Sequence, residues 1–223
     1  MASTYDVLAR LHQRFREQRA RLFMRLMQPA AHARVLDLGS GTGSFSRLIA
    51  QHRPVQITMA DVLDHSEAAA QNGAAFVRLP ATGPLPFPDR AFDIVLCNSV
   101  IEHATAPANR QREVEWRRAS WQVQQSFAAE IRRVGNGYFV QTPHRDFPVD
   151  VHLWLPFTNW LPHQHLERLR PLVDRYWIKE CDAVDWNLLR TQDMRKLFPD
   201  AHLHVEKLAG LPKSIIAYRR VAS

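Results

Sequence analysis

Apolar residues follow two different spacings along this chain of 223 residues. Short runs of aliphatic and β-branched residues predict strands at 34–38, 55–60, 75–79, 92–97, 138–141, 202–208 and 214–219. Apolar positions that recur every three or four residues predict helices at 5–28, 44–51, 109–133 and 191–198. Strands that alternate with helices favour a parallel sheet with right-handed crossovers, whereas a short turn joins the last two strands and requires them to pair antiparallel. We therefore predict an α/β fold with a doubly wound, mostly parallel seven-stranded sheet and a C-terminal antiparallel hairpin strand.

Two segments lie outside this alternation, within what we expect to be a single domain over 1–223. The N-terminal segment 1–28 reads as an amphipathic helix or helix pair, which either closes over a cofactor or packs permanently on the sheet. Segment 144–190, an insertion after the fifth strand, is rich in aromatic residues: Phe147, Trp154, Phe157, Trp160, Tyr176, Trp177 and Trp186. These side chains form either a lid over an apolar ligand pocket or a small core of the insertion itself.

The composition, 46% hydrophobic and 23% charged, is that of an ordinary globular protein. The formal net charge is +7, but the arginines are spread among acidic residues, which favours a solvated basic surface over a nucleic-acid footprint. No run approaches the roughly 20 apolar residues that span a bilayer, and no signal-peptide pattern opens the chain. The two cysteines, Cys97 and Cys181, are expected to be reduced thiols of a cytoplasmic protein.

No Cys-x-x-Cys spacing occurs, and we expect no metal site.

The most informative feature is the turn between the first strand and the next helix, which contains Gly39, Gly41 and Gly43. Glycines there let the backbone bend sharply and let a ligand approach closely. Ligands of open α/β sheets bind at the carboxyl ends of the strands, where Asp61 ends the second strand and can bind a ribose. Asp61 could instead cap a helix. Together these residues predict a cofactor that contains a nucleoside.

Asp37 separates two candidate cofactors. It stands two residues before the first glycine, where its carboxylate would repel a pyrophosphate and attract the amino group of a methionine. The dinucleotide fingerprint G-x-G-x-x-G also needs glycine or alanine as its third conserved residue. This chain has Ser44 at that position. The pattern therefore favours a cofactor that carries a cationic amino acid over one that carries phosphates.

The string Val35-Leu-Asp-Leu-Gly-Ser-Gly-Thr-Gly43 closely resembles the first motif of class I S-adenosylmethionine-dependent methyltransferases. The string from Leu85 to His103 is similar to the fourth strand of their type-11 group, and Leu197 to Ala217 is similar to the closing hairpin of bacterial members. The resemblance covers about 20–143 and 190–220. It implies methyl transfer on a Rossmann-like sheet. The insertion lies outside the resemblance, and its aromatic residues and place after the fifth strand lead us to expect it on the acceptor side.

The resemblance also implies a set of cofactor contacts. The methionine moiety would be held by Asp37 and the turn, the ribose by Asp61, the adenine by Val62 and the loop at Ala81, and the sulfonium would lie over the end of the fourth strand. The implied residues are Asp37, Gly39, Ser40, Gly41, Gly43, Asp61, Val62, Ala81, Asn98 and Ser99. The family often has Asp where this chain has Pro80, so backbone carbonyls would have to bind the adenine amino group here.

A general base for the acceptor has four candidates. His103 follows the fourth strand, His144 follows the fifth, and Asp150 and His152 come soon after. Histidine titrates near neutral pH and suits this role; we prefer His144 and His152, with Asp150 as an orienting group. The expected acceptor is an O, N or C atom of a small molecule or glycan. RNA methylation, NAD(P)-dependent oxidoreduction and a non-catalytic partner role are the alternatives.

Overall fold

The computed structural model describes residues 4–107, 112–150, 152–153, 155–176 and 184–221, with only the backbone at 4–12, 163, 170 and 172–176. The chain divides into two compact units. The first comprises 1–98, 130–140 and 218–223, and the second comprises 99–129 and 141–217. The expectation of a single domain stays a prediction.

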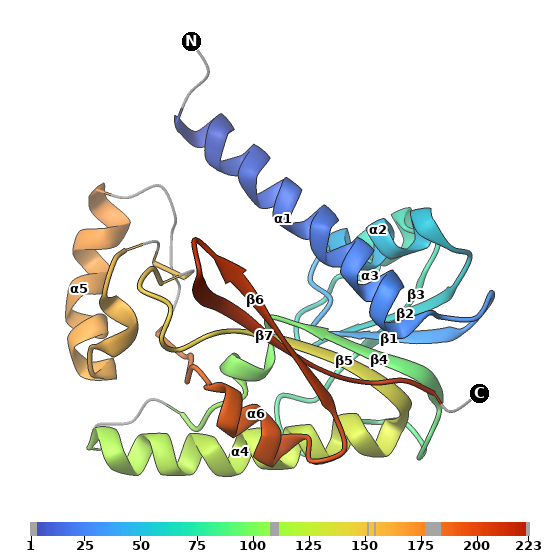
Figure 1. Ribbon diagram of the computed structural model, residues 1–223. Helices are drawn as coiled ribbons and strands as arrows, with labels where there is room; N and C mark the ends of the chain where they lie inside the picture. Colours follow the sequence, from blue (N-terminus) through green and yellow to red (C-terminus); the bar gives the residue numbers. More distant parts are fainter. Residues whose placement is uncertain (1–3, 108–111, 151, 154, 177–183, 222–223) are drawn as a thin grey trace. The chain divides into compact units, whose positions relative to one another are not determined.

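The first unit contains the alternating part of the chain (Figure 1). Its elements are α1 (Thr4–Met27), β1 (Arg34–Leu38), α2 (Ser44–His52), β2 (Gln56–Asp61), α3 (Ser66–Gln71), β3 (Ala75–Arg78) and β4 (Phe92–Asn98). β1 pairs in parallel with β2 and with β4, and β2 pairs in parallel with β3. The carboxyl ends of β1, β2 and β4 therefore share one edge of the sheet.

The remaining elements follow β4. They are the 3-10 helix η1 (Ile101–His103), α4 (Glu113–Val134), β5 (Gly135–Pro143), the 3-10 helix η2 (Thr158–Trp160), α5 (His163–Tyr176), α6 (Thr191–Leu197), β6 (His202–Leu208) and β7 (Leu211–Arg219). The strand order is β3-β2-β1-β4-β5-β7-β6. The sheet is mostly parallel with antiparallel C-terminal strands, which confirms the predicted fold class.

Most predicted elements appear within a few residues of their expected bounds, but α3 and α5 were not predicted and β5 begins earlier than expected. α3 forms where the sequence shows no clear helical period. β5 begins at Gly135 and not at 138, so Gly135 to Gly137 are part of the strand. A Cβ at Gly137 would lie 2.7 Å from the carbonyl oxygen of Arg219, so this strand can pass so close to the C-terminal segment only with glycine there.

The core of the first unit lies between α1 and the sheet. Leu22, Phe23 and Met27 of α1 are buried, and the rings of Phe23 and Phe139 meet edge to face with centroids 5.3 Å apart. Such an aromatic pair adds to the stabilisation that comes from burial. The C-terminal half of α1 is thus part of the fold, as the packing alternative predicts.

The insertion builds a core of its own inside the second unit. Its buried members are Leu153, Leu166, Val184, Trp186 and Leu188, with Leu155 and Leu161 packed against them. Phe157 and Trp160 are about half exposed and contact each other. Trp154 and Trp177 lie outside the described residues. Trp186 therefore belongs to the small core of the insertion, one of the two predicted alternatives. Phe157 and Trp160 are exposed enough to contact a ligand.

Cys97 is buried in β4, and Cys181 lies outside the described residues. Among the helices that the structure describes, none has both the length and the apolar character needed to cross a membrane.

Candidate functional site

Backbone N–H groups of the turn after β1 donate hydrogen bonds to the end of β2. Gly39 N–H donates to the Ala60 carbonyl at 2.8 Å, and Gly41 N–H donates to Asp61 Oδ2 at 2.9 Å. Gly39, Gly41 and Gly43 all have positive φ, at 71°, 48° and 69°. L-residues other than glycine adopt this region at a cost, so the turn has this shape because of its glycines.

Gly43 and Gly41 have different structural roles. A Cβ on Gly43 would lie 2.7 Å from both Met59 Sδ and Asn72 Nδ2, so Gly43 allows α2 to start against the sheet. A Cβ on Gly41 would meet no atom of the described residues within 4 Å. The space over Gly41 is therefore open to a ligand, as expected for a cofactor turn.

Asp37 is a buried carboxylate at the carboxyl end of β1, with 4% of its surface exposed. Its Oδ2 atom is buried and has no hydrogen-bond partner in the described part of the chain. Burial raises the pKa of Asp37 to about 6, against the lowering effect of the Ser46 hydroxyl and with a smaller rise from Asp61. An unsatisfied buried carboxylate is costly, so a cationic ligand would stabilise it.

Asp61 links the glycine turn to the end of β2. Its Oδ2 accepts the Gly41 N–H, and its Oδ1 accepts the N–H of Leu63 at 3.1 Å. These contacts fix the carboxylate beside the turn and differ from those of a helix cap. A carboxylate oxygen can accept more than one hydrogen bond, so ribose hydroxyls can still reach it.

The expected adenine contacts lie at the surface of the first unit. Val62, directly after β2, is 49% exposed. Ala81 and Pro80 are exposed in the loop that joins β3 to β4. That loop has no regular secondary structure, so its shape depends on contacts from elsewhere in the unit.

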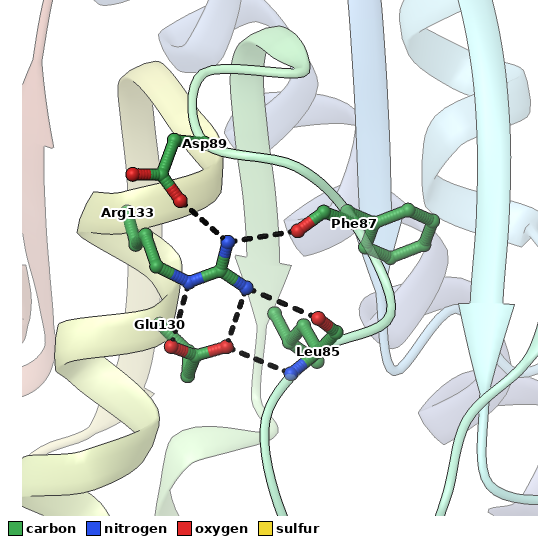
Figure 2. Close-up of polar contacts among 5 residues, drawn as sticks. All are labelled: Leu85, Phe87, Asp89, Glu130 and Arg133. Atoms are coloured by element: carbon green, nitrogen blue, oxygen red, sulfur yellow. Dashed lines mark hydrogen bonds and ion pairs between the residues drawn. The ribbon is translucent and has the colours of Figure 1, made fainter.

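Arg133 of α4 supplies those contacts (Figure 2). Its guanidinium donates to the carbonyl oxygens of Leu85 and Phe87 and to Asp89 Oδ1, at 2.8 to 3.0 Å. Glu130 accepts from Arg133 and also from Leu85 N–H at 2.7 Å. The second half of the loop is thus fixed to the last turn of α4.

Asn98, at the end of β4, contacts a residue that the sequence analysis did not select. Its Oδ1 accepts a hydrogen bond from Arg19 Nη1 at 3.1 Å, and Arg19 is only 9% exposed. Arg16 Nη1 donates to Ser44 Oγ at 3.3 Å, while its Nε is buried without a hydrogen-bond partner in the described ranges. A signal existed: Arg19 stands four residues after Phe15 and four before Phe23, at an apolar position of the helix. The structure adds Arg16 and Arg19 to the candidate site.

The remaining predicted residues belong to the second unit. Ser99 has a positive φ of 56°, and its hydroxyl donates to Gln141 Oε1 at 2.9 Å. His144 is buried; its Nδ1 accepts from Asp146 N–H at 3.0 Å and its Nε2 lies 3.3 Å from Thr191 Oγ1. Burial lowers the pKa of His144. Both of its ring nitrogens have protein partners, which favours a structural role, and its catalytic role stays a prediction.

His103, Asp150 and His152 lie close together in the structure. The distance between His103 and the other two residues along the sequence does not by itself imply this contact. The rings of His103 and His152 meet edge to face, with centroids 5.1 Å apart. Asp150 is fully buried and its Oδ1 accepts the N–H groups of His152 and Leu153, at 2.6 and 2.8 Å. Burial by itself raises the pKa of Asp150, but its contacts to His152 and to these N–H groups outweigh burial and lower it.

Glu102 and Asp185 join this cluster, although the sequence analysis did not select them. Asp185 Oδ1 lies 2.7 Å from His103 Nδ1. Glu102 is fully buried, and burial raises the pKa of its carboxyl despite the nearby His103 and His152. Glu102 adjoins His103 in the sequence, so the acid–histidine pair was a usable signal, whereas Asp185 lies far along the chain.

Comparison with known proteins places the chain in a family. Residues 9–190 match the family described as a methyltransferase domain. The uncharacterized methyltransferase YcgJ of Bacillus subtilis is 32% identical over 187 residues, which cover 78% of this chain and 64% of that protein. Malonyl-[acyl-carrier protein] O-methyltransferase of Halorhodospira halophila is 31% identical over 121 residues, which cover 51% of this chain and 40% of that protein. This chain therefore spans less than two thirds of the length of either relative.

Solved structures show the same fold at low sequence identity. Magnesium protoporphyrin IX methyltransferase of Synechocystis PCC 6803, solved with bound SAH, matches with a TM-score of 0.52 and 16% identity, over 98% of this chain and 89% of that one. The family match covers most of the chain. The chain belongs to the methyltransferase domain family, which confirms the assignment, made from its sequence motifs, to the class I S-adenosylmethionine-dependent methyltransferases.

Proposed function

We propose that this protein transfers the methyl group of S-adenosylmethionine to an O, N or C atom of a small-molecule or glycan acceptor. One observation carries the proposal: Asp37, buried beside the glycine turn, has an oxygen without a hydrogen-bond partner among the described residues. The ammonium group of the methionine moiety would pair with this carboxylate. A diphosphate at the same place would face a like charge.

The other contacts of the first unit support the same cofactor. The open space over Gly41 admits the methionine backbone, and Asp61 stands where ribose hydroxyls bind in α/β sheets. Arg16, near the start of α2, is a guanidinium that would pair with the methionine carboxylate. Asn98 would lie near the sulfonium, held in place by Arg19.

Methyl transfer is a displacement at a carbon that the positive sulfur already activates. Aligning the acceptor with the methyl group contributes as much as ~7–11 kcal/mol, and a general base adds a factor of about 10² to 10⁴ where the acceptor must lose a proton. Among the candidates, His103 and His152 with Asp150 form a cluster, whereas His144 is engaged by Asp146 and Thr191. We therefore rank the cluster above His144 for acceptor activation.

The acceptor itself has to be found by experiment, because the relatives are named for different acceptors, a malonyl-acyl carrier protein and a magnesium protoporphyrin. Labelled S-adenosylmethionine would be incubated with the protein and with cell extracts fractionated into small molecules, glycans and RNA. Label in the small-molecule or glycan fraction is the expected outcome. Label in RNA alone would support the RNA alternative and contradict the proposed acceptor class.

Cofactor identity is tested separately by calorimetry with S-adenosylmethionine and with NADH. Binding of the sulfonium compound alone is expected. Tight NADH binding without any signal from S-adenosylmethionine would reverse the proposal and favour an oxidoreductase. Binding of S-adenosylmethionine with no turnover on any fraction would contradict catalysis and favour the non-catalytic partner.

A further inference from the structure

We propose that Glu102, His103 and His152 form a binding site for a divalent transition-metal ion in the second unit. One potential ligand atom from each of the three residues lies within 4.8 Å of the other two. Ligand atoms bound to one ion at about 2.0–2.2 Å stand somewhat closer together, so small side-chain rotations would complete the site. The proposal goes beyond methyl transfer and does not depend on it.

Glu102 is the strongest sign that a cation belongs there. Its side chain is fully buried, and neither carboxylate oxygen has a hydrogen-bond partner within the described ranges. Leaving a buried carboxylate without a partner carries a large desolvation penalty. Its neighbours include the Thr142 hydroxyl and the imidazoles of His103 and His152, and a metal ion shared with the imidazoles would neutralise the charge and satisfy the oxygens.

The two histidines are oriented in different ways. His103 Nδ1 lies 2.7 Å from Asp185 Oδ1, whereas His152 Nδ1, at 3.5 Å from Asp150 Oδ1, has no hydrogen-bond partner among the described residues. A carboxylate behind an imidazole fixes the ring and raises its basicity as a ligand. His152 is also stacked on Trp186, with ring centroids 4.3 Å apart and planes inclined by 15°. Both rings are therefore oriented by groups that are themselves outside the proposed ligand set.

The donor types indicate which ions fit. Imidazole suits zinc, iron, nickel and copper, whereas magnesium and calcium favour sites made of oxygen atoms. Two imidazoles and one carboxylate therefore favour a transition metal such as Zn²⁺. With three protein ligands, at least one coordination position stays available for an oxygen atom of water or of a bound compound.

The partial exposure of His103 is consistent with access of solvent to the open coordination position. The His103 side chain is 36% exposed, whereas the His152 side chain is 12% exposed. A bound cation would lower the pKa of a coordinated hydroxyl group, and the two histidines would then act as ligands and not as general bases. This proposal departs from the expectation, drawn from the sequence, that the chain has no metal site.

The test is metal binding by the untagged chain of 223 residues after dialysis against a chelator. Zn²⁺ would be titrated by calorimetry, and Co²⁺ would be added to record visible absorption bands. One equivalent should bind, the thermal midpoint should rise with added Zn²⁺, and Co²⁺ should give bands typical of nitrogen coordination. Less than one equivalent of Zn²⁺ would overturn the proposal.

Variants identify the ligands. Glu102→Gln and His152→Asn should each weaken Zn²⁺ binding by more than about 100-fold, and Asp185→Asn, which acts through His103, by roughly 10–100-fold. His52→Asn removes an exposed histidine of α2 and should bind Zn²⁺ like the wild type. Circular dichroism would show that each variant is folded, and Asp185, which is half exposed, offers a variant that tests the site without disturbing its core. Equal affinity in Glu102→Gln, Asp185→Asn and His52→Asn would refute the assignment.

Discussion

Glu130 and Arg133 form a two-pronged ion pair in the last turns of α4. Arg133 Nε and Nη2 donate to the two carboxylate oxygens of Glu130, at 2.8 and 2.7 Å (Figure 2). The same guanidinium binds the loop between β3 and β4 through Leu85, Phe87 and Asp89. Because bidentate pairs fix geometry as well as charge, this pair turns an irregular loop into a defined part of the first unit.

Arg133→Ala should therefore destabilise the protein. The substitution removes hydrogen bonds to two backbone carbonyls and two carboxylates, and it leaves Glu130 with Leu85 N–H as its remaining contact in Figure 2. We expect the free energy of unfolding to fall by about 1.5–3 kcal/mol, the scale of hydrogen bonds to charged groups. Urea unfolding measures it, with Arg118→Ala, an exposed arginine of the same helix, as the control. Equal losses in both variants would show that the loop contacts contribute little.

Asp37→Asn should change stability in a pH-dependent way. The pKa of Asp37 is raised from 3.8 to about 6 by burial, so the folded state holds this proton more tightly than the unfolded state. The resulting stabilisation is complete below about pH 4 and is lost as the pH rises through 6. Asparagine carries no charge, so at pH 8 the variant should be more stable than the wild type by roughly 2–3 kcal/mol.

The difference should narrow to about half at pH 5, where the folded wild-type carboxyl is mostly protonated. Urea unfolding of both proteins without cofactor, at pH 5 and pH 8, gives the comparison. If the difference in the free energy of unfolding is constant with pH, or is larger at pH 5, the charged carboxylate of Asp37 does not destabilise the folded protein.

Asp37→Ala and Asp61→Ala should each weaken S-adenosylmethionine binding by roughly 1–3 kcal/mol, the scale of a hydrogen bond to a charged group. Asp37 would lose the ammonium contact, and Asp61 would lose the ribose contact together with its bond to Gly41 N–H. Asp64→Ala is the matched control, because Asp64 is exposed and lies just beyond Asp61. Calorimetry at pH 8 measures the three affinities. Unchanged affinity in the first two variants would exclude the proposed placement of the cofactor.

Gly41→Ala and Gly73→Ala separate backbone strain from blocked ligand space. Both glycines have positive φ, at 48° and 64°, and a Cβ on either would meet no atom of the described residues within 4 Å. Each alanine should therefore lower the free energy of unfolding by about 1–2 kcal/mol. Only Gly41→Ala should also weaken S-adenosylmethionine binding, because only that Cβ enters the proposed cofactor space. Calorimetry of both variants decides; equal affinities would mean that the space over Gly41 does not receive the cofactor.

The elements that sequence reasoning predicted well are those encoded locally. β1, β4 and α2 are short, strongly patterned segments, and their predicted bounds agree with the structure to within one residue. α3 was missed because its six residues carry only a single buried side chain, Ala69, which leaves no period to detect. The start of β5 at Gly135 was missed because glycine normally ends regular structure, and only the close approach of the C-terminal segment makes it necessary there.

The cluster of Glu102, His103, Asp150 and His152 depended on contacts that no local pattern reports. His103 and His152 were singled out one by one, and Glu102 was overlooked although it adjoins His103. Asp185 and Trp186 come from a segment more than thirty residues beyond His152 in the numbering, yet they orient the two rings. Likewise, the contact between Arg19 and Asn98 joins the first helix to the end of the fourth strand.

The sequence by itself determined the alternation of strands and helices, the glycine turn and the acidic residue before it, because backbone freedom at glycine and a carboxylate in an apolar strand are properties of a few consecutive residues. Only the tertiary structure decided that Asp37 keeps an oxygen without a hydrogen-bond partner among the residues that the structure describes, that Arg133 fixes the loop after β3, and that Glu102 lies near two histidines. Burial and hydrogen-bond partners depend on what the rest of the chain brings into contact, and that is set by packing across long separations in sequence.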